Sequence, residues 1–164
     1  MKIFIWLITV VLLTLVAKWE FQVDINGYSN SDSVSTKALE NIPVTINLDR
    51  VIEAIEQVES GGDVNALGDY LDGEHRAVGC LQIWKIYVLD VNRISGRKFS
   101  FEDRLCKAKS YEMARIYLQF YARSERIGHE PTAEDYARIH NGGPNGYKKE
   151  CTIPYWNKVK SILN

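Results

Sequence analysis

Residues 47–62 have the sequence NLDRVIEAIEQVESGG and carry the strongest structural signal in the chain. Asn47 is a residue type that caps the first turn of a helix, and the paired glycines Gly61 and Gly62 are typical of a helix end. Between them the apolar side chains recur at the spacing of one helical face, at Val51, Ile52, Ile55 and Val58. The segment therefore predicts an amphipathic helix that presents one apolar face to a core.

Helical signals continue from this segment to the end of the chain. Ser100 with Asp103, and Thr132 with Asp135, have the spacing of capping pairs, and Thr152 can cap a last helix. Strand signals are weak outside residues 62–83. The further helices are expected at about 84–94, 105–121, 132–140 and 152–163. This pattern predicts a mainly α domain with a small irregular or β-containing lobe.

The N-terminal region differs from the rest of the chain. A basic start precedes an apolar stretch that ends at Ala17, which matches a secretory signal and is shorter than a usual membrane-spanning helix. Leu15 stands where a cleavage site prefers a small residue, so a cleaved signal and a retained anchor both stay open. The protein is exported in either case. The expected organisation is a signal or membrane anchor at 1–17, a polar stalk at 18–46 and one globular domain at 47–164.

Composition and charge exclude several classes of protein. A chain of 164 residues is long enough for one domain, and ordinary glycine and proline contents exclude collagen-like and disordered classes. Lys plus Arg is 20 and Asp plus Glu is 21, which leaves a net charge of −1. Because nucleic-acid binding depends on neutralising phosphates, this balance argues against a nucleic-acid partner. Membrane contact is expected only through the N-terminal segment.

The cysteine count is odd, so internal disulfides cannot pair every thiol. Export permits oxidation of Cys80, Cys106 and Cys151. The preferred pair is Cys106 with Cys151, because Cys80 lies inside a motif described below. The alternative is three reduced cysteines.

Glu59 is the first residue with a plausible chemical role. It lies in the last turn of the expected first helix, beside an apolar residue and before the double glycine. The carboxyl end of a helix carries a partial negative charge that disfavours an ionised carboxylate, and partial burial acts in the same direction. A carboxylic acid that stays protonated near neutral pH is what a general acid needs to protonate a leaving glycosidic oxygen.

Two other short motifs follow Glu59 in the chain. Residues 79–83 read GCLQI and place Gln82 between apolar residues, and residues 138–143 read RIHNGG and end a helix with an imidazole and an amide. Together with Glu-Ser-Gly at 59–61, this order resembles the lytic transglycosylase family with the soluble-lytic-transglycosylase-like (SLT) domain. That family shares a lysozyme-like α+β fold with the goose-type lysozymes. The resemblance covers roughly 48–163.

The resemblance implies roles for individual residues. Glu59 matches the single catalytic glutamate of the family, which acts first as acid and then as base, and Ser60 matches the residue placed near the substrate. Gln82 and Ile83 match the motif that lines the sugar cleft. The pair His140 and Asn141 matches a Tyr-Asn pair whose tyrosine contacts the catalytic glutamate; together with Ser60, Gln82 and Ile83 these are the expected substrate-binding residues.

The chain departs from the family pattern in two ways. His140 replaces the tyrosine, so that an imidazole in contact with Glu59 would titrate with it as a coupled pair. The segment after Glu59 is also longer than usual and supplies four acids that could act as the second carboxylate of a hydrolase: Asp63, Asp69, Asp72 and Glu74. A lytic transglycosylase needs no second carboxylate, because the muramoyl C6 hydroxyl attacks intramolecularly and gives a 1,6-anhydro product.

The favoured function is therefore a peptidoglycan lytic transglycosylase that cleaves the β-1,4 bond between N-acetylmuramic acid and N-acetylglucosamine. The alternative is a lysozyme that hydrolyses the same bond, and a lesser alternative is a non-catalytic glycan-binding module. No cofactor and no metal are expected, and the expected partners are peptidoglycan strands and a cell-envelope assembly.

Two other chemistries are weaker interpretations of the same residues. Cys80, His140 and Asn141 have the residue types of a papain-like peptidase, but no nucleophile signature of that family surrounds the cysteine. A zinc site would need Cys80 with the three histidines, including His75 and His129, and no two of these residues have the close spacing of a zinc motif.

Overall fold

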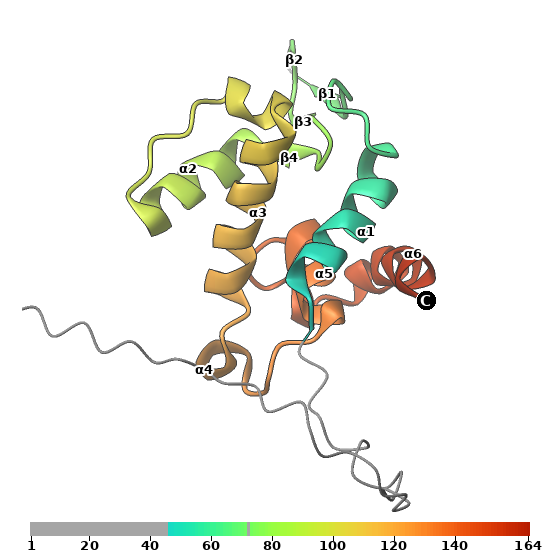
Figure 1. Ribbon diagram of the computed structural model, residues 1–164. Coiled ribbons are helices and arrows are strands. Elements are labelled where there is room, and N and C mark those ends of the chain that lie inside the picture. The colour runs from blue at the N-terminus through green and yellow to red at the C-terminus, as the bar shows by residue number, and fades with distance from the viewer. Residues whose placement is uncertain (1–45, 72) are drawn as a thin grey trace, which may run out of the picture. The chain divides into compact units, whose positions relative to one another are not determined.

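The computed structural model describes residues 46–71 and 73–164, which form one helical domain with a small β-containing lobe (Figure 1). The expected fold class is thereby confirmed. The expected signal or anchor at 1–17 and all but the last residue of the stalk at 18–46 lie outside the described residues, and their boundaries stay predictions. Within the described ranges no helix is both long enough and apolar enough to cross a membrane.

Six α-helices and three short 3-10 helices are found in the described part of the chain. The α-helices are α1 (Leu48–Ser60), α2 (Lys85–Ser95), α3 (Lys107–Tyr121), α4 (Ser124–Ile127), α5 (Ala133–Gly142) and α6 (Ile153–Leu163). The 3-10 helices are η2 (Glu102–Leu105), η3 (Gly146–Lys148) and η4 (Glu150–Thr152). The five longer α-helices therefore lie where the sequence pattern predicts them, whereas α4 and the 3-10 helices were not predicted.

Helix α1 forms as its sequence predicts. The side chain of Asn47 accepts hydrogen bonds from the backbone N–H groups of Asp49 and Arg50, and Gly61 ends the helix in the left-handed conformation with φ of 63°. The apolar face is buried and packs against α3, α5 and α6. Because α1 is central to the core, the last turn of this helix is held in a fixed place, and that turn carries Glu59.

The small lobe connects α1 to α2 and consists of two antiparallel two-stranded sheets. Strands β1 (Tyr70–Leu71) and β2 (Glu74–His75) form one hairpin, and β3 (Ala77–Val78) and β4 (Ile83–Trp84) form the other. An isolated bridge joins Leu67 to Val78. The buried guanidinium of Arg104 donates to the carbonyl oxygens of Arg76 and Ile83, at 3.2 Å and 3.0 Å. This contact fastens the lobe to η2.

The structure corrects two of the three expected helix caps and confirms the third. Asp103 does accept a hydrogen bond from the N–H of Ser100, but Asp103 lies in the 3-10 helix η2, and α3 begins only at Lys107. Thr152 precedes α6 without capping it, because its hydroxyl bonds the carbonyl oxygens of Gly146 and Lys149 in the preceding turns. The pair Thr132 and Asp135 forms a reciprocal capping box at the start of α5, as predicted.

The expected disulfide between Cys106 and Cys151 is wrong. All three cysteines are free thiols in the structure. Cys106 lies just before α3 and Cys151 lies within η4. Both of these cysteines are exposed, whereas Cys80 is fully buried. The spacing of three cysteines along a chain carries no information on the distance between them, so the pairing had no geometric support.

Candidate active site

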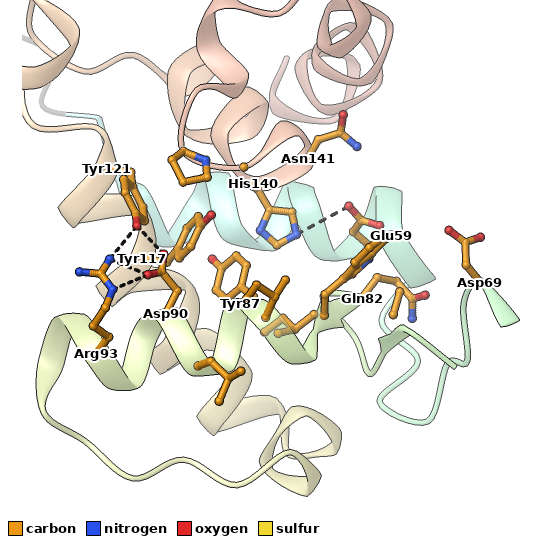
Figure 2. Close-up of a pocket in the computed structure, with 17 residues that line it drawn as sticks. Glu59, Asp69, Gln82, Tyr87, Asp90, Arg93, Tyr117, Tyr121, His140 and Asn141 are labelled. Carbon is orange, nitrogen blue, oxygen red and sulfur yellow. Dashed lines mark hydrogen bonds and ion pairs between the residues drawn. The ribbon is translucent and has the colours of Figure 1, made fainter. Parts of the chain in front are cut away.

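A cavity of about 770 Å³ lies beside the last turn of α1, and residues of the small lobe, α2, α3 and α5 line it (Figure 2). Glu59, Asp69 and Gln82 lie toward one end, and His140 and Asn141 lie on the α5 side. Tyrosines of α2 and α3 lie toward the other end. Most of the site residues predicted from distant parts of the sequence thus line one cavity, whereas Ser60 and Asp63 do not.

Glu59 has two close neighbours, and both approach the same oxygen. The hydroxyl of Tyr155 donates a 2.7 Å hydrogen bond to Oε1 of Glu59, and Nε2 of His140 lies 3.7 Å from that atom. The Glu59 side chain is 19% exposed. Among the described residues nothing bonds Oε2. The carboxyl group is therefore oriented through one oxygen, while the other is left for a ligand.

His140 is a buried, neutral histidine whose hydrogen bond goes to the backbone. Its side chain is only 4% exposed, and Nε2 lies 3.0 Å from the carbonyl oxygen of Leu81. Burial lowers the pKa of His140, while the Glu59 carboxylate and the Leu81 carbonyl raise it to a smaller extent. The expected contact with Glu59 is thus present as an electrostatic contact at 3.7 Å, and the hydrogen bond goes to Leu81.

This pKa shift gives a prediction for stability. Because the folded protein keeps His140 neutral to a lower pH than the unfolded chain does, the unfolded chain gains a proton first as the pH falls below about 6.5. The stabilising contribution is present above that pH and is lost on acidification. The unfolding free energy of His140→Gln should therefore fall less between about pH 7 and pH 5 than that of the wild type. Urea denaturation of both proteins measures this difference. Parallel stability curves for the two proteins would contradict this account.

Tyr155 was not predicted from the sequence. It lies in the first turn of α6, 96 positions after Glu59, and no local pattern marks it as a partner of the acid. Burial raises the pKa of Tyr155, and the neighbouring Glu59 carboxylate raises it further. The group therefore stays a phenol and acts as a hydrogen-bond donor. In this chain a tyrosine hydroxyl contacts the glutamate, but from α6 rather than from the position of His140.

We expect Tyr155→Phe to lower the rate of catalysis by about tenfold without unfolding the domain. The hydrogen bond orients Glu59 and stabilises the carboxylate that forms when the acid gives up its proton. Initial rates of peptidoglycan clearance, with thermal unfolding measured in parallel, test this expectation. Tyr136→Phe is the matched control, because Tyr136 is half-buried on α5 and does not line the cavity. Equal rates for the two variants would show that the Tyr155 hydroxyl is dispensable.

The other expected substrate-binding residues have different surroundings. The hydroxyl of Ser60 donates to the carbonyl oxygen of Cys80 and accepts from the N–H of Gly62, so it fastens the end of α1 to the turn after β3. Gln82 lines the cavity, and its amide nitrogen donates to the carbonyl oxygens of Ala66 and Gly79. The side chain of Gln82 therefore shapes the cavity wall through bonds within the small lobe.

Ile83 and Asn141 both line the cavity. Ile83 is buried in the core, whereas Asn141 is exposed near the end of α5. Gln82 also has φ of 47°, and it is the one non-glycine residue with a positive φ in the described part of the chain. The tight turn that precedes β4 thus sets the direction of the Gln82 side chain, which the sequence pattern did not indicate.

The four candidates for a second carboxylate are placed differently. Asp69 is exposed and lines the cavity that contains Glu59. Asp63 accepts a 2.8 Å hydrogen bond from the N–H of Asn65, as expected of a residue that caps a turn. Glu74 lies in β2, and Asp72 lies outside the described residues. Of the candidates with a described side chain, Asp69 is the one that shares the cavity with Glu59.

Cys80 does not have the surroundings of a nucleophile. It is fully buried and is not among the residues that line the cavity. Burial, with a smaller contribution from the neighbouring Glu56, raises the pKa of the Cys80 thiol to about 11. Since the thiolate is the reactive form, this environment disfavours the papain-like interpretation. Among the described residues, no group of three or more potential metal ligands comes together.

Comparison with known proteins gives a consistent set of relatives. No family model matches the chain. A lysozyme of Ostrea edulis is 33% identical over 114 residues, which cover 69% of this chain and 79% of the relative. An invertebrate-type lysozyme of Ruditapes philippinarum is 32% identical, and the match covers 65% of this chain and 74% of the relative. The crystal structure of an inhibitor-bound lysozyme from Meretrix lusoria matches with a TM-score of 0.57 and 30% identity, covering 69% of this chain and 88% of that one.

The fold, the half-buried glutamate beside a cavity and these relatives define an enzyme of the lysozyme-type glycoside hydrolase class. The chain belongs to the invertebrate-type lysozyme family. The lysozyme-like fold expected from the motifs is confirmed, but the relatives are invertebrate-type lysozymes and not bacterial SLT lytic transglycosylases. Short motifs around a glutamate and a glutamine identify this fold more securely than they identify one family within it.

Proposed function

We propose that this protein is an exported lysozyme that hydrolyses the β-1,4 bond between N-acetylmuramic acid and N-acetylglucosamine in peptidoglycan. The observation that carries the proposal is the setting of Glu59, which lies at the edge of the cavity and is held through one oxygen only. Such a carboxyl group can present a proton from its other oxygen to a glycosidic oxygen. The family relationship supports hydrolysis over the transglycosylation expected from the motifs.

The neighbours of Glu59 assist this role in distinct ways. Tyr155 donates to Oε1, so it orients the acid and stabilises the carboxylate that remains after proton transfer. His140 is neutral and buried, so it adds no positive charge that would favour ionisation of Glu59 before the substrate binds. Both groups come from the helical part of the domain, and the cavity continues from Glu59 into the small lobe.

A hydrolase of this kind needs a second carboxylate, which activates water or stabilises the developing charge on the sugar. We assign this role to Asp69, because its side chain lines the cavity with Glu59. Asp69→Asn should lower the rate of cleavage about a hundredfold or more, and Asp63→Asn is the control from the same segment. If Asp72→Asn lowers the rate of cleavage and Asp69→Asn does not, Asp72 is the second carboxylate.

Mass spectrometry of the muropeptides released from purified peptidoglycan tests the reaction itself. A lysozyme releases fragments with reducing ends, and this is the result we expect. Fragments lighter by one water, with anhydro ends, would contradict hydrolysis and restore the transglycosylase interpretation. Binding to peptidoglycan without release of fragments would instead identify a non-catalytic glycan-binding module.

We also propose that the segment before residue 47 serves export. An apolar stretch at 1–17 and a polar stalk at 18–46 would deliver the domain outside the cell, either free or attached to a membrane. N-terminal sequencing of the protein isolated from its native source distinguishes a processed chain from a retained anchor.

A further inference from the structure

Two buried polar atoms beside the active site have no hydrogen-bond partner in the part of the chain that the structure describes. They are the hydroxyl oxygen of Tyr87 and Nδ1 of His140. Tyr87 is 8% exposed and the His140 side chain 4%. Buried polar groups in folded proteins are almost always hydrogen-bonded, because an unpaired one has lost its bonds to water without replacement. A donor and an acceptor that both lack a partner at the same place therefore call for a common explanation.

The two atoms have complementary chemistry. Nε2 of His140 lies 3.0 Å from the carbonyl oxygen of Leu81, which can only accept, so Nε2 carries the ring proton. In a neutral imidazole Nδ1 is then an acceptor that needs a donor. Tyr87 can be that donor, because burial raises its pKa well above the usual value and the hydroxyl keeps its proton.

The rings of Tyr87 and His140 lie next to each other in the structure. The Tyr87 and His140 rings meet edge to face, with centroids 5.8 Å apart and an interplanar angle of 61°. Figure 2 shows His140 between Glu59 and the tyrosines, so that the nitrogen opposite the Glu59 contact faces the tyrosines. Tyr87 is stacked on Tyr117 at 3.8 Å, which supports its ring from the other side.

We propose that Tyr87 is a positioning residue whose hydroxyl donates a hydrogen bond to Nδ1 of His140. This bond fixes the tautomer and the ring orientation that hold the Nε2 proton beside the Leu81 carbonyl and Oε1 of Glu59. Tyr87 thus acts on the acid through His140 and does not touch the reacting atoms. Only its effect on rate rests on the proposed function; the hydrogen bond itself does not.

Nitrogen NMR of the histidine rings tests the bond directly. The chain has three histidines, and His140→Gln identifies the signals of His140. In the wild type we expect a protonated Nε2 and an unprotonated, hydrogen-bonded Nδ1. Tyr87→Phe should move the Nδ1 signal toward that of a free nitrogen and leave Nε2 protonated, whereas Tyr117→Phe should leave both signals in place. An unchanged Nδ1 signal in Tyr87→Phe, or a change only in Tyr117→Phe, would overturn the proposal.

The effect on rate provides the second measurement. Tyr87→Phe should lower kcat about fivefold with little change in KM, and should add no further loss in a His140→Gln background. Tyr136→Phe serves as the control, as it does for Tyr155. Additive losses of Tyr87→Phe and His140→Gln would overturn the proposal. If no protein in the series cleaves peptidoglycan while the Nδ1 signal still responds to Tyr87→Phe, the proposed function fails and the hydrogen bond stands.

Discussion

Glu59→Gln should abolish cleavage of peptidoglycan while the domain stays folded. Glutamine keeps the size of the side chain and can still accept the hydrogen bond from Tyr155, but it has no proton to give to the leaving oxygen. Because general acid catalysis contributes about 10²–10⁴-fold, the rate should fall by at least about a hundredfold. Initial rates on purified peptidoglycan, followed by release of soluble muropeptides, measure this loss.

The matched control for this variant is Glu53→Gln. Glu53 is exposed on the same helix and does not line the cavity that contains Glu59. Glu53→Gln should cleave peptidoglycan at the wild-type rate, and thermal unfolding should show that both variants are folded. If Glu59→Gln keeps more than about a tenth of the wild-type rate, Glu59 is not the general acid.

The parts of the fold that were predictable are those that depend on local sequence. Helix α1 has its cap, its apolar face and its glycine stop within one short segment, so its limits followed from elementary rules. Glu59 was singled out by its place at the end of that helix together with the motifs at 79–83 and 138–143, and its catalytic role stays a prediction. The capping box of α5 belongs to the same category, since Thr132 and Asp135 are three residues apart.

The contacts that define the site are long-range and could not be predicted. Tyr155 reaches Glu59 from 96 positions away, and His140 bonds a carbonyl 59 positions away. Whether a side chain meets such a partner depends on how α1, α5 and α6 pack together, which single-segment patterns do not specify. The wrong disulfide has the same origin, because residue types were known for Cys106 and Cys151 but their distance was not.

The resemblance to SLT transglycosylases shows a further limit of motif reasoning. It correctly implied a lysozyme-like fold. Glu59, Gln82 and His140 line one cavity, and their roles in binding and catalysis stay predictions. It could not specify the family. A glutamate in the last turn of a helix and a glutamine before a strand suit both a hydrolase and a transglycosylase that cut this bond with a general acid. The candidates for a second carboxylate, the group that would separate hydrolysis from transglycosylation, lie between Asp63 and Glu74, where the chain departs from the motif pattern.

Gly79→Ala should destabilise the domain more than any conservative change on its surface. Gly79 lies in the turn between β3 and β4 with φ of 80°, a conformation that L-residues rarely adopt. A Cβ atom at this position would lie 1.9 Å from the carbonyl oxygen of Arg104, which is far inside van der Waals contact. That oxygen cannot move freely, because it accepts a 2.8 Å hydrogen bond from the buried hydroxyl of Ser110.

The comparison with Gly128→Ala separates the steric clash from the backbone strain. Gly128 has φ of 88°, but a Cβ atom there would meet nothing within 4 Å. Alanine at this position therefore adds only the strain of the left-handed conformation, which costs about 1–2 kcal/mol of unfolding free energy. Gly79→Ala adds the clash with Arg104 and should cost more than about 4 kcal/mol in unfolding free energy. Urea denaturation of both variants measures the difference. Since the Leu81 carbonyl that bonds His140 lies in the same turn, Gly79→Ala should also lower cleavage under conditions in which Gly128→Ala is fully active. Equal destabilisation by the two substitutions would mean that the turn can move away from Arg104, and would contradict a rigid connection between this turn and the active site.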